Sequence, residues 1–386
     1  MQILLHFCCR EYSFFSMNKQ LVCRVALFFG LLAPCFVSAQ TDPLFTHFTF
    51  NKLLYNAAYA GASDQFCINA ISHQQWLGYD DETQLLKTQS GLPTSDKLKT
   101  NIAPKTTGFA FSAPIMYKGI NYGGAFFSFV DDKIAYEKNT YLKGGFSYAY
   151  VLPDASSIRI GIDFSSLTKG LDGSKLRAHD PGDPLIPSGD VSDTRSTVGA
   201  GIYYSTSSIK DGAYLGVSST HISPQTFNYG TNSTINITTN RHLYVVGGYH
   251  QNNFMGNPAL SLDPAFLVKT VMGKGGLIKP QIDIQGIATW NELFSGGANF
   301  RFYGLGADAL SVMFGYYPPL LGANGAGSAQ KLRVGYSYDL TLSKILRTSA
   351  GSHELQVNYC FMFTLPERPI KIYRHPRWME RPSEWD

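Results

Sequence analysis

The stretch 335-GYSYDLTLSKILRTSAGSHELQVNYCF-361 contains two segments in which apolar and polar residues alternate, joined by a polar hinge. In the first segment Tyr336 and Tyr338 alternate with polar residues, and in the second Leu355 and Val357 do the same. An alternation with a period of two is typical of β-strands, because successive side chains point to opposite faces of a sheet. The stretch therefore predicts two strands and the loop that connects them.

The same alternation recurs along most of the chain. In 156-SSIRIGIDFSSL-167, apolar residues occupy one face, and Arg159 and Asp163 belong to the other. We find no internal repeat of the kind that indicates a propeller or a solenoid. The segments of this kind number fourteen, which is even: 65–77, 107–117, 120–131, 138–152, 156–168, 196–207, 212–221, 241–251, 258–272, 279–290, 293–303, 308–317, 331–341 and 352–365.

The composition decides between two all-β interpretations. A soluble sandwich would bury the apolar face of each strand, whereas a membrane barrel turns that face to lipid and the polar face to its lumen. Only 16% of the residues are charged, and the chain contains 23 Tyr, 26 Phe and 37 Gly, whereas soluble proteins are about 25% charged. No later stretch approaches the roughly 18 apolar residues of a transmembrane helix. We therefore predict an all-β fold, a transmembrane antiparallel β-barrel of about 14 strands.

The lengths of the connections predict an orientation. Every second connection is mostly short, as at 153–155 and 291–292, and the alternate ones include long loops at 78–106, 169–195 and 222–240. The long loops are expected to lie on the surface, because they are rich in turn-forming residues. Bacterial barrels combine short periplasmic turns with longer outer loops. The first strand would then run outward, and both termini would lie on the periplasmic side of a bacterial outer membrane.

Residues 1–39 are predicted to be a signal peptide. From Met17 the sequence has a basic region, an apolar region and a small-residue cleavage site that ends at Ala39. A lipoprotein with its lipid on Cys35 is disfavoured, because Pro34 directly precedes it and a good cleavage site follows.

Residues 40–64 and 366–386 flank the predicted barrel, 65–365. The first segment carries five aromatic residues, and it either plugs the periplasmic mouth or forms part of a partner surface. The second segment is a Pro-rich tail with Trp378 and Trp385. It is either a disordered end or a strip that docks a periplasmic protein.

No motif points to catalysis, a cofactor or a metal. The segment 322-GANGAGSAQK-331 lacks the lysine and the helix of a phosphate-binding loop, and the histidines lack zinc-site spacing. There is no Gly-x-Ser-x-Gly elbow, although a barrel hydrolase could assemble a Ser-His-Asp set in space. Asp131 and Asp132 fit a solvated loop tip better than a calcium site. Because none of these motifs is present, we predict a protein that is not an enzyme. The net charge of +4 gives no argument for nucleic-acid binding.

Motifs at both ends of the chain resemble those of one family. They are 42-DPLFTHFTFNKLLYNAAYAGAS-63, 74-QQWLGYD-80, Gly335–Asp339, Thr341–Lys344 and Gly351–Glu354. This set is similar to the signature of the PorP/SprF family, outer-membrane proteins of the type IX secretion and gliding-motility systems. Ala57 departs from the proline of the family motif, and this departure puts little in doubt. The loop at 78–106 is longer than is typical of the family, and this departure puts the identity of the partner in doubt.

The resemblance implies a non-enzymatic accessory protein of a Bacteroidetes-type envelope. Such a protein would support secretion or surface anchoring of a type IX secretion system substrate, such as a large adhesin. Its partners would be that secreted or surface-displayed substrate, the lipid bilayer, and machinery components of the periplasm and outer membrane, with a peptidoglycan-binding lipoprotein as one candidate. The alternative is an outer-membrane porin or solute channel, and a blocked lumen would argue against it.

The signature and several aromatic residues supply candidate partner-binding residues. Asp339 or Glu354 could pair with Lys344 or Arg347 of the last loop, or these residues could only fix the hairpin and close the barrel. The candidate set is Gly335, Tyr336, Tyr338, Asp339, Lys344, Arg347, His353, Glu354, Trp76, Tyr59, Trp378 and Trp385.

Cys67 and Cys360 are expected to lie close together. Barrel closure pairs the first strand with the last, and this places both residues near the same rim and on the lumen face. An oxidising periplasm would allow a disulfide bond between them. A register offset of two residues would prevent it, so the sequence leaves the bond open.

Overall fold

The structure is a computed structural model that describes residues 42–79, 102–176, 187, 189–206, 211–229, 236–273, 276–304, 306–319 and 331–362. The predicted signal peptide, most of the loop at 78–106, and the tail at 366–386 with Trp378 and Trp385 lie outside the described residues. Within these ranges, no helix is both long enough and apolar enough to cross a membrane.

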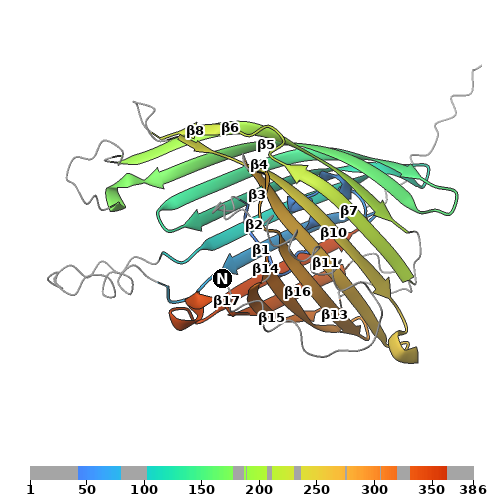
Figure 1. Cartoon of the computed structure of the whole chain (residues 1–386). Coiled ribbons are helices and arrows are strands. Elements are labelled where there is room, and N and C mark those ends of the chain that lie inside the picture. The colour runs from blue at the N-terminus through green and yellow to red at the C-terminus, as the bar shows by residue number, and fades with distance from the viewer. Residues whose placement is uncertain are drawn as a thin grey trace, which may run out of the picture. The chain divides into compact units, whose positions relative to one another are not determined.

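Fourteen antiparallel strands form a closed β-barrel (Figure 1), and each overlaps one of the predicted segments. Neighbours along the chain pair with one another, and β1 pairs with β17 to close the barrel. The barrel strands are β1 (Phe66–Gln74), β2 (Lys105–Tyr117), β3 (Ile120–Ile134), β4 (Glu137–Val151), β5 (Ser157–Asp172), β6 (Asp190–Ser205), β7 (Asp211–Thr220), β10 (Arg241–Gln251), β11 (Leu260–Gly273), β13 (Gln281–Trp290), β14 (Phe294–Tyr303), β15 (Gly306–Tyr316), β16 (Lys331–Thr341) and β17 (Ser352–Phe361).

The two faces of the strands identify the barrel as a membrane barrel. In β5, Ile160 and Phe164 are 57% and 61% exposed on the outer face. Arg159 and Asp163 of the same strand are 4% and 3% exposed and point into the lumen. An exposed apolar face and a buried polar face are the reverse of a soluble sandwich, and they fit a barrel whose outer face contacts lipid.

The two ends of the barrel differ in their connections. β1 begins at the short-turn end, where β2 and β3 are joined at 118–119 and β4 and β5 at 152–156. The opposite end, which we call the long-loop end, carries the connections at 173–189 and 221–240. Which end faces the periplasm stays a prediction.

The strands that flank the loop predicted at 169–195 are longer than expected. β5 extends to Asp172 and β6 begins at Asp190. Thr168 and Thr194 face each other across this extension, with their hydroxyl oxygens 2.8 Å apart. The pairing of β5 with β6 continues here through backbone hydrogen bonds between residues that mostly have polar side chains. These residues have no alternating apolar face, so the sequence pattern did not predict the longer strands.

Short elements also occur outside the barrel strands. Phe227 is fully buried against Val130, Tyr141 and Leu167 on the inner face of the barrel. The loop at 222–240, expected to lie on the surface, therefore folds partly into the lumen. These elements are β8 (Thr226–Asn228), β9 (Asn236–Thr238), β12 (Gly276–Leu277), η1 (Lys52–Leu54), η2 (Ala57–Tyr59), η3 (Gly173–Lys175), η4 (Phe254–Gly256) and η5 (Lys344–Arg347), the last five being 3-10 helices.

The closing strand pair is covalently joined. Cys67 of β1 lies directly opposite Cys360 of β17, with Cα atoms 4.1 Å apart, and the two sulfurs form a disulfide bond. Asn69 and Gln356 on the same face of these strands are buried in the lumen. The expected proximity of the two cysteines is confirmed, because β1 and β17 pair without a register offset at this point.

Candidate functional site

Residues 42–64, which we call the plug, run through the lumen of the barrel. Thr46 bonds to Asp339 and Glu354, which lie near the long-loop ends of β16 and β17. Gly61 packs against Gly123 near the short-turn end of β3. The sequence suggested a plug at one mouth, whereas the segment extends along the lumen between the two halves of the barrel.

The plug is folded and packed as a small core. Asn56 begins η2 and accepts a hydrogen bond from the backbone N–H of Ala58 at 2.9 Å, which satisfies a donor at the start of the helix. The hydroxyl of Tyr55 donates to the carbonyl oxygen of Phe48 at 3.0 Å. Phe48 and Tyr55 pack with Tyr244 and Leu267 of the wall, so apolar burial adds to the polar bonds.

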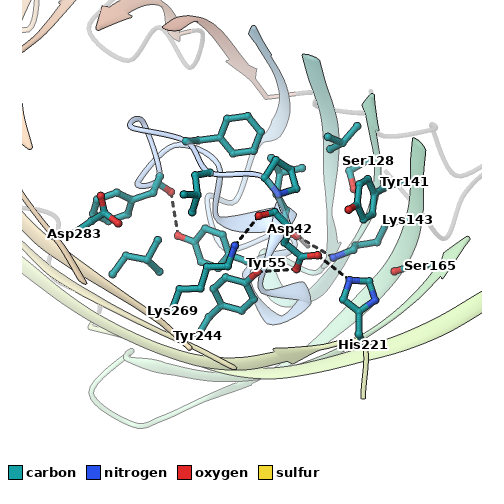
Figure 2. Close-up of a pocket in the computed structure, with 17 residues that line it drawn as sticks. Asp42, Tyr55, Ser128, Tyr141, Lys143, Ser165, His221, Tyr244, Lys269 and Asp283 are labelled. Carbon is teal, nitrogen blue, oxygen red and sulfur yellow. Dashed lines mark hydrogen bonds and ion pairs between the residues drawn. The ribbon is translucent and has the colours of Figure 1, made fainter. Parts of the chain in front are cut away.

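The first anchor of the plug is Asp42 (Figure 2). Its carboxylate lies 2.8 Å from Nε2 of His221 and accepts hydrogen bonds from the hydroxyls of Tyr244 at 2.7 Å and Thr220 at 2.9 Å. Lys269 donates to the backbone carbonyl of Asp42 at 2.7 Å. Asp42, His221, Tyr244 and Lys269 border a cavity of about 60 Å³. Donors from several wall elements thus hold the first described residue of the chain.

The charge around Asp42 favours its ionised form. Burial alone would raise the pKa of Asp42, but the charges of His242, His221 and Lys269 and the hydrogen bond from His221 hold that pKa well below its usual value. The ligand atoms of Asp42, His221 and His242 lie within 4.8 Å of one another, which a metal ion could use. The ammonium of Lys269 would repel a cation, and both carboxylate oxygens already have partners. We therefore interpret the cluster as an anchor of the plug.

The second anchor consists of the two carboxylates of the C-terminal signature. Glu354, which is 1% exposed, accepts hydrogen bonds from the backbone N–H groups of Thr46 at 2.8 Å and His47 at 2.7 Å. Its oxygen also lies 2.6 Å from Nδ1 of His47. Asp339 accepts a hydrogen bond from the hydroxyl of Thr46 at 2.6 Å. Charge-assisted bonds of this kind are about twice as strong as neutral ones.

Asp339 and Glu354 thus have partners in the plug, and no pairing with Arg347 is found among the described residues. The side chain of Lys344 lies outside the described residues, so the suggested pairing with Lys344 stays a prediction. Both carboxylates share the inward face of their strands, whereas Arg347 is an exposed residue of the loop between them. The nearest guanidinium to Asp339 is that of Arg301, whose Nη1 lies 3.6 Å from the carboxylate. The strand alternation that predicted the barrel also explains why these groups face the lumen.

The third anchor lies at the short-turn end. The backbone N–H of Gly61 donates to the Ser112 hydroxyl at 3.0 Å, and the Asn121 side chain donates to the Gly61 carbonyl at 2.7 Å. Gly61 has a φ of +69°, and a Cβ placed on it would lie 2.5 Å from the carbonyl oxygen of Gly123. A Cβ on Gly124 would lie 2.5 Å from the Gly61 nitrogen. Glycine is needed here because the two backbones touch.

A larger cavity of about 830 Å³, which we call the vestibule, lies beside the plug at the short-turn end. Lys52 of η1 contributes to its wall and is 8% exposed. The Nζ of Lys52 lies 4.2 Å from the ring centroid of Tyr214 and 4.9 Å from that of Tyr59. Burial lowers the pKa of Lys52 to about 8, and the charge of Asp263 limits the fall. The vestibule therefore combines a buried amine with an aromatic wall.

The outward half of the signature lies away from the plug. The hydroxyl of Tyr336 lies 2.7 Å from Nδ1 of His353, and the rings of Tyr338 and His353 meet edge to face at 5.3 Å. The backbone N–H of Trp76 donates to the Ser352 hydroxyl at 3.1 Å. These residues join the segment after β1 to the last hairpin near the long-loop end.

The remaining candidates are dispersed. Gly335 lies beside the guanidinium of Arg333, and a Cβ at this position would require that side chain to shift. Tyr59 belongs to the plug and packs on Tyr203 at 5.3 Å. Lys344 and Arg347 form part of η5. The predicted set thus divides among the lumen, the vestibule and the long-loop end.

Sequence analysis missed most of the residues that hold the plug. Asp42, Thr46, His47, Lys52 and Gly61 were part of an aromatic segment but were not singled out. The partners of Thr46 and His47 are about 300 positions away in the chain, which no local pattern predicts. The available signal was the presence of charged and polar residues between the aromatic ones.

Comparisons with known proteins give a family match and several structural likenesses. A family model described as type IX secretion system membrane protein PorP/SprF matches residues 37–359. A comparison with curated proteins gives no significant match.

Three solved structures illustrate the structural likeness. The Ralstonia pickettii toluene transporter TbuX has a TM-score of 0.42 and 11% identity, over 80% of this chain and 92% of that chain. The TodX deltaS2S3 mutant monoaromatic hydrocarbon channel has a TM-score of 0.46 and 8% identity, over 81% and 94%. The translocator domain of the autotransporter NalP from Neisseria meningitidis has a TM-score of 0.41 and 9% identity, over 89% and 98%. At these values the likenesses carry no argument about function.

Proposed function

We propose a function from the family of this chain, which belongs to the PorP/SprF family of type IX secretion system membrane proteins. The protein is a non-enzymatic accessory protein, and it supports secretion or surface anchoring of a type IX substrate such as a large adhesin. Membership of the family gives the protein a secretion-related role in the outer membrane. The particular substrate, and the choice between secretion and anchoring, are parts of the proposal.

The filled lumen is the observation that carries this proposal. The plug is packed against the wall through apolar contacts and anchored through Asp42, Thr46, His47 and Gly61. A barrel that is occupied in this way presents its rims and loops to other molecules. Binding of a partner is therefore a better use of this architecture than diffusion of a solute.

Two partner surfaces follow from the candidate residues. Tyr336, Tyr338 and His353 form a connected aromatic group near the long-loop end, and aromatic residues are enriched in binding hot spots. We assign the secreted substrate to the rim at the long-loop end, where the hydroxyl of Tyr338 donates a hydrogen bond to the Ala350 carbonyl of the last hairpin. The tail at 366–386, with its two tryptophans, is assigned to the secretion machinery, with a peptidoglycan-binding lipoprotein as one candidate.

Co-purification from the native envelope, followed by mass spectrometry, tests both assignments. The double variant Tyr336→Ala/Tyr338→Ala should lose a secreted companion, and deletion of 366–386 should lose a periplasmic one. The matched control is Tyr148→Ala/Tyr150→Ala, because these tyrosines are exposed on the outer face toward the short-turn end of β4. Retention of every companion by both test proteins would contradict the assignments.

The alternative function is that of an outer-membrane porin or solute channel. The vestibule favours it, because a cavity of about 830 Å³ is large enough for a small solute. The plug opposes it, because the vestibule ends on plug residues such as Phe50 and Lys52. Conductance of the purified protein separates the two functions.

A further inference from the structure

The ammonium of Lys52 is unusual among the buried lysines of the lumen. Lys143 donates to the carbonyl oxygen of Leu54 at 2.9 Å, and Lys269 donates to that of Asp42 at 2.7 Å. Both of these lysines hold the plug. In the described part of the chain, Nζ of Lys52 has no hydrogen-bond acceptor or ion-pair partner, and its close neighbours are the rings of two tyrosines.

The acidic residues of the vestibule wall are engaged elsewhere. Asp263 of β11 forms a hydrogen bond with Nδ1 of His250. Glu292, which lies on the turn between β13 and β14 and has an 89% exposed side chain, lies 3.8 Å from Nζ of Lys331. A buried charge without an anionic partner is costly, and cation–π contacts offset only part of that cost. An anion that entered the vestibule would complete the charge pair.

We propose that the vestibule is a binding site for a carboxylate or phosphate group carried on an aromatic or apolar chain. The ammonium of Lys52 meets the anionic group, and the attached chain lies along the tyrosine wall. This wall includes Tyr59, Tyr214, Tyr249 and Tyr317, and the cavity of about 830 Å³ lies within the usual size range of ligand pockets. At neutral pH the amine is largely protonated, since the pKa of Lys52 is lowered only to about 8.

This site goes beyond the proposed function. It lies at the short-turn end, away from the rim at the long-loop end to which we assign the secreted substrate. Binding of a small anion there can be measured without any protein partner. Failure of the site would leave the proposed accessory role untouched, and failure of that role would leave the site untouched.

Isothermal titration of the purified protein in detergent tests the proposal with three probes. These are N-acetylphenylalanine, its uncharged amide, and phenyl phosphate. The carboxylate or the phosphate should bind about tenfold or more tightly than the amide, because only the anions can pair with Lys52. The anion that binds with the higher affinity indicates whether the natural ligand is a carboxylate or a phosphate ester.

The critical variant is Lys52→Met, which keeps the length of the apolar stem. It should weaken anion binding about tenfold or more and leave amide binding unchanged. Lys331→Met is the matched control, because Lys331 lines the same cavity with a 67% exposed side chain, and it should change binding by less than about threefold. Equal losses in both variants, or no loss in Lys52→Met, would overturn the proposal.

Misfolding of a variant and competition by the tail are tested separately. Heat-dependent mobility on a gel verifies that each variant is a folded barrel. A protein without 366–386 is titrated beside the full chain. Anion binding by the truncated protein alone would support the site and identify the tail as its competitor, and the absence of anion binding in both proteins would overturn it.

Discussion

Replacing Glu354 by Ala should release the amino-terminal half of the plug. The substitution removes the acceptor of two backbone N–H groups, those of Thr46 and His47, and the partner of the His47 ring, all at 2.8 Å or less. A buried donor left without its acceptor costs about 1–3 kcal/mol, so the three donors together lose about 3–9 kcal/mol. At the lower figure, local opening of the plug becomes roughly 100-fold more frequent, because each 1.4 kcal/mol is a factor of ten.

Hydrogen exchange of residues 42–55, followed by mass spectrometry in detergent, measures this opening. Glu354→Gln should fall between the wild type and Glu354→Ala, because it keeps one acceptor oxygen. Glu292→Ala is the control, since Glu292 is a highly exposed glutamate on a turn, and it should leave the exchange unchanged. If the plug of a folded Glu354→Ala barrel exchanges as slowly as the wild type, then Glu354 does not hold the plug.

Three other variants test the disulfide bond and the plug anchors at Gly61 and Asp42. Cys67→Ser/Cys360→Ser opens a covalent loop with a sequence separation of 293, a constraint worth about 6 kcal/mol in the chain-entropy account. The barrel should therefore lose its compact gel mobility at a lower temperature, and an unchanged temperature would refute this. Gly61→Ala should raise plug exchange about tenfold or more, since its Cβ would collide with the Gly123 carbonyl, and wild-type exchange would show that the close approach is not required. Asp42→Asn should loosen the start of the plug. The lowered pKa of Asp42 gives a stabilisation that is complete above the usual 3.8 and is lost only as the pH falls through the lower folded value. Wild-type protection should therefore be equal at about pH 5 and pH 7, and a loss at pH 5 would contradict this reasoning.

The barrel was predictable from sequence because the alternation of apolar and polar residues along each strand is a local pattern. Alternation in segments such as 156–167 assigns every second residue to lipid, and Ile160, Phe164 and Asp163 lie on the faces that this rule gives. The disulfide was open at that stage, because it depends on the shear of the closing pair. A single offset of two residues would have separated Cys67 from Cys360.

The plug anchors were not predictable for a different physical reason. Glu354 was selected for its place in a signature, and its inward direction follows from strand alternation. Its partners, Thr46 and His47, come from the opposite end of the chain. Only the closed barrel brings these segments together. The same holds for Lys52, whose lack of a hydrogen-bonded or ion-paired acidic partner among the described residues is a property of the assembled vestibule.

Conductance in a planar bilayer tests most directly the central claim that this barrel is closed by its own amino-terminal segment. The purified wild-type protein should give no steady current, because the plug is anchored at both halves of the lumen. A protein without residues 42–61 that still forms the barrel should give a steady, ohmic conductance. A steady conductance of the wild type equal to that of the deleted protein would contradict the claim and favour the channel.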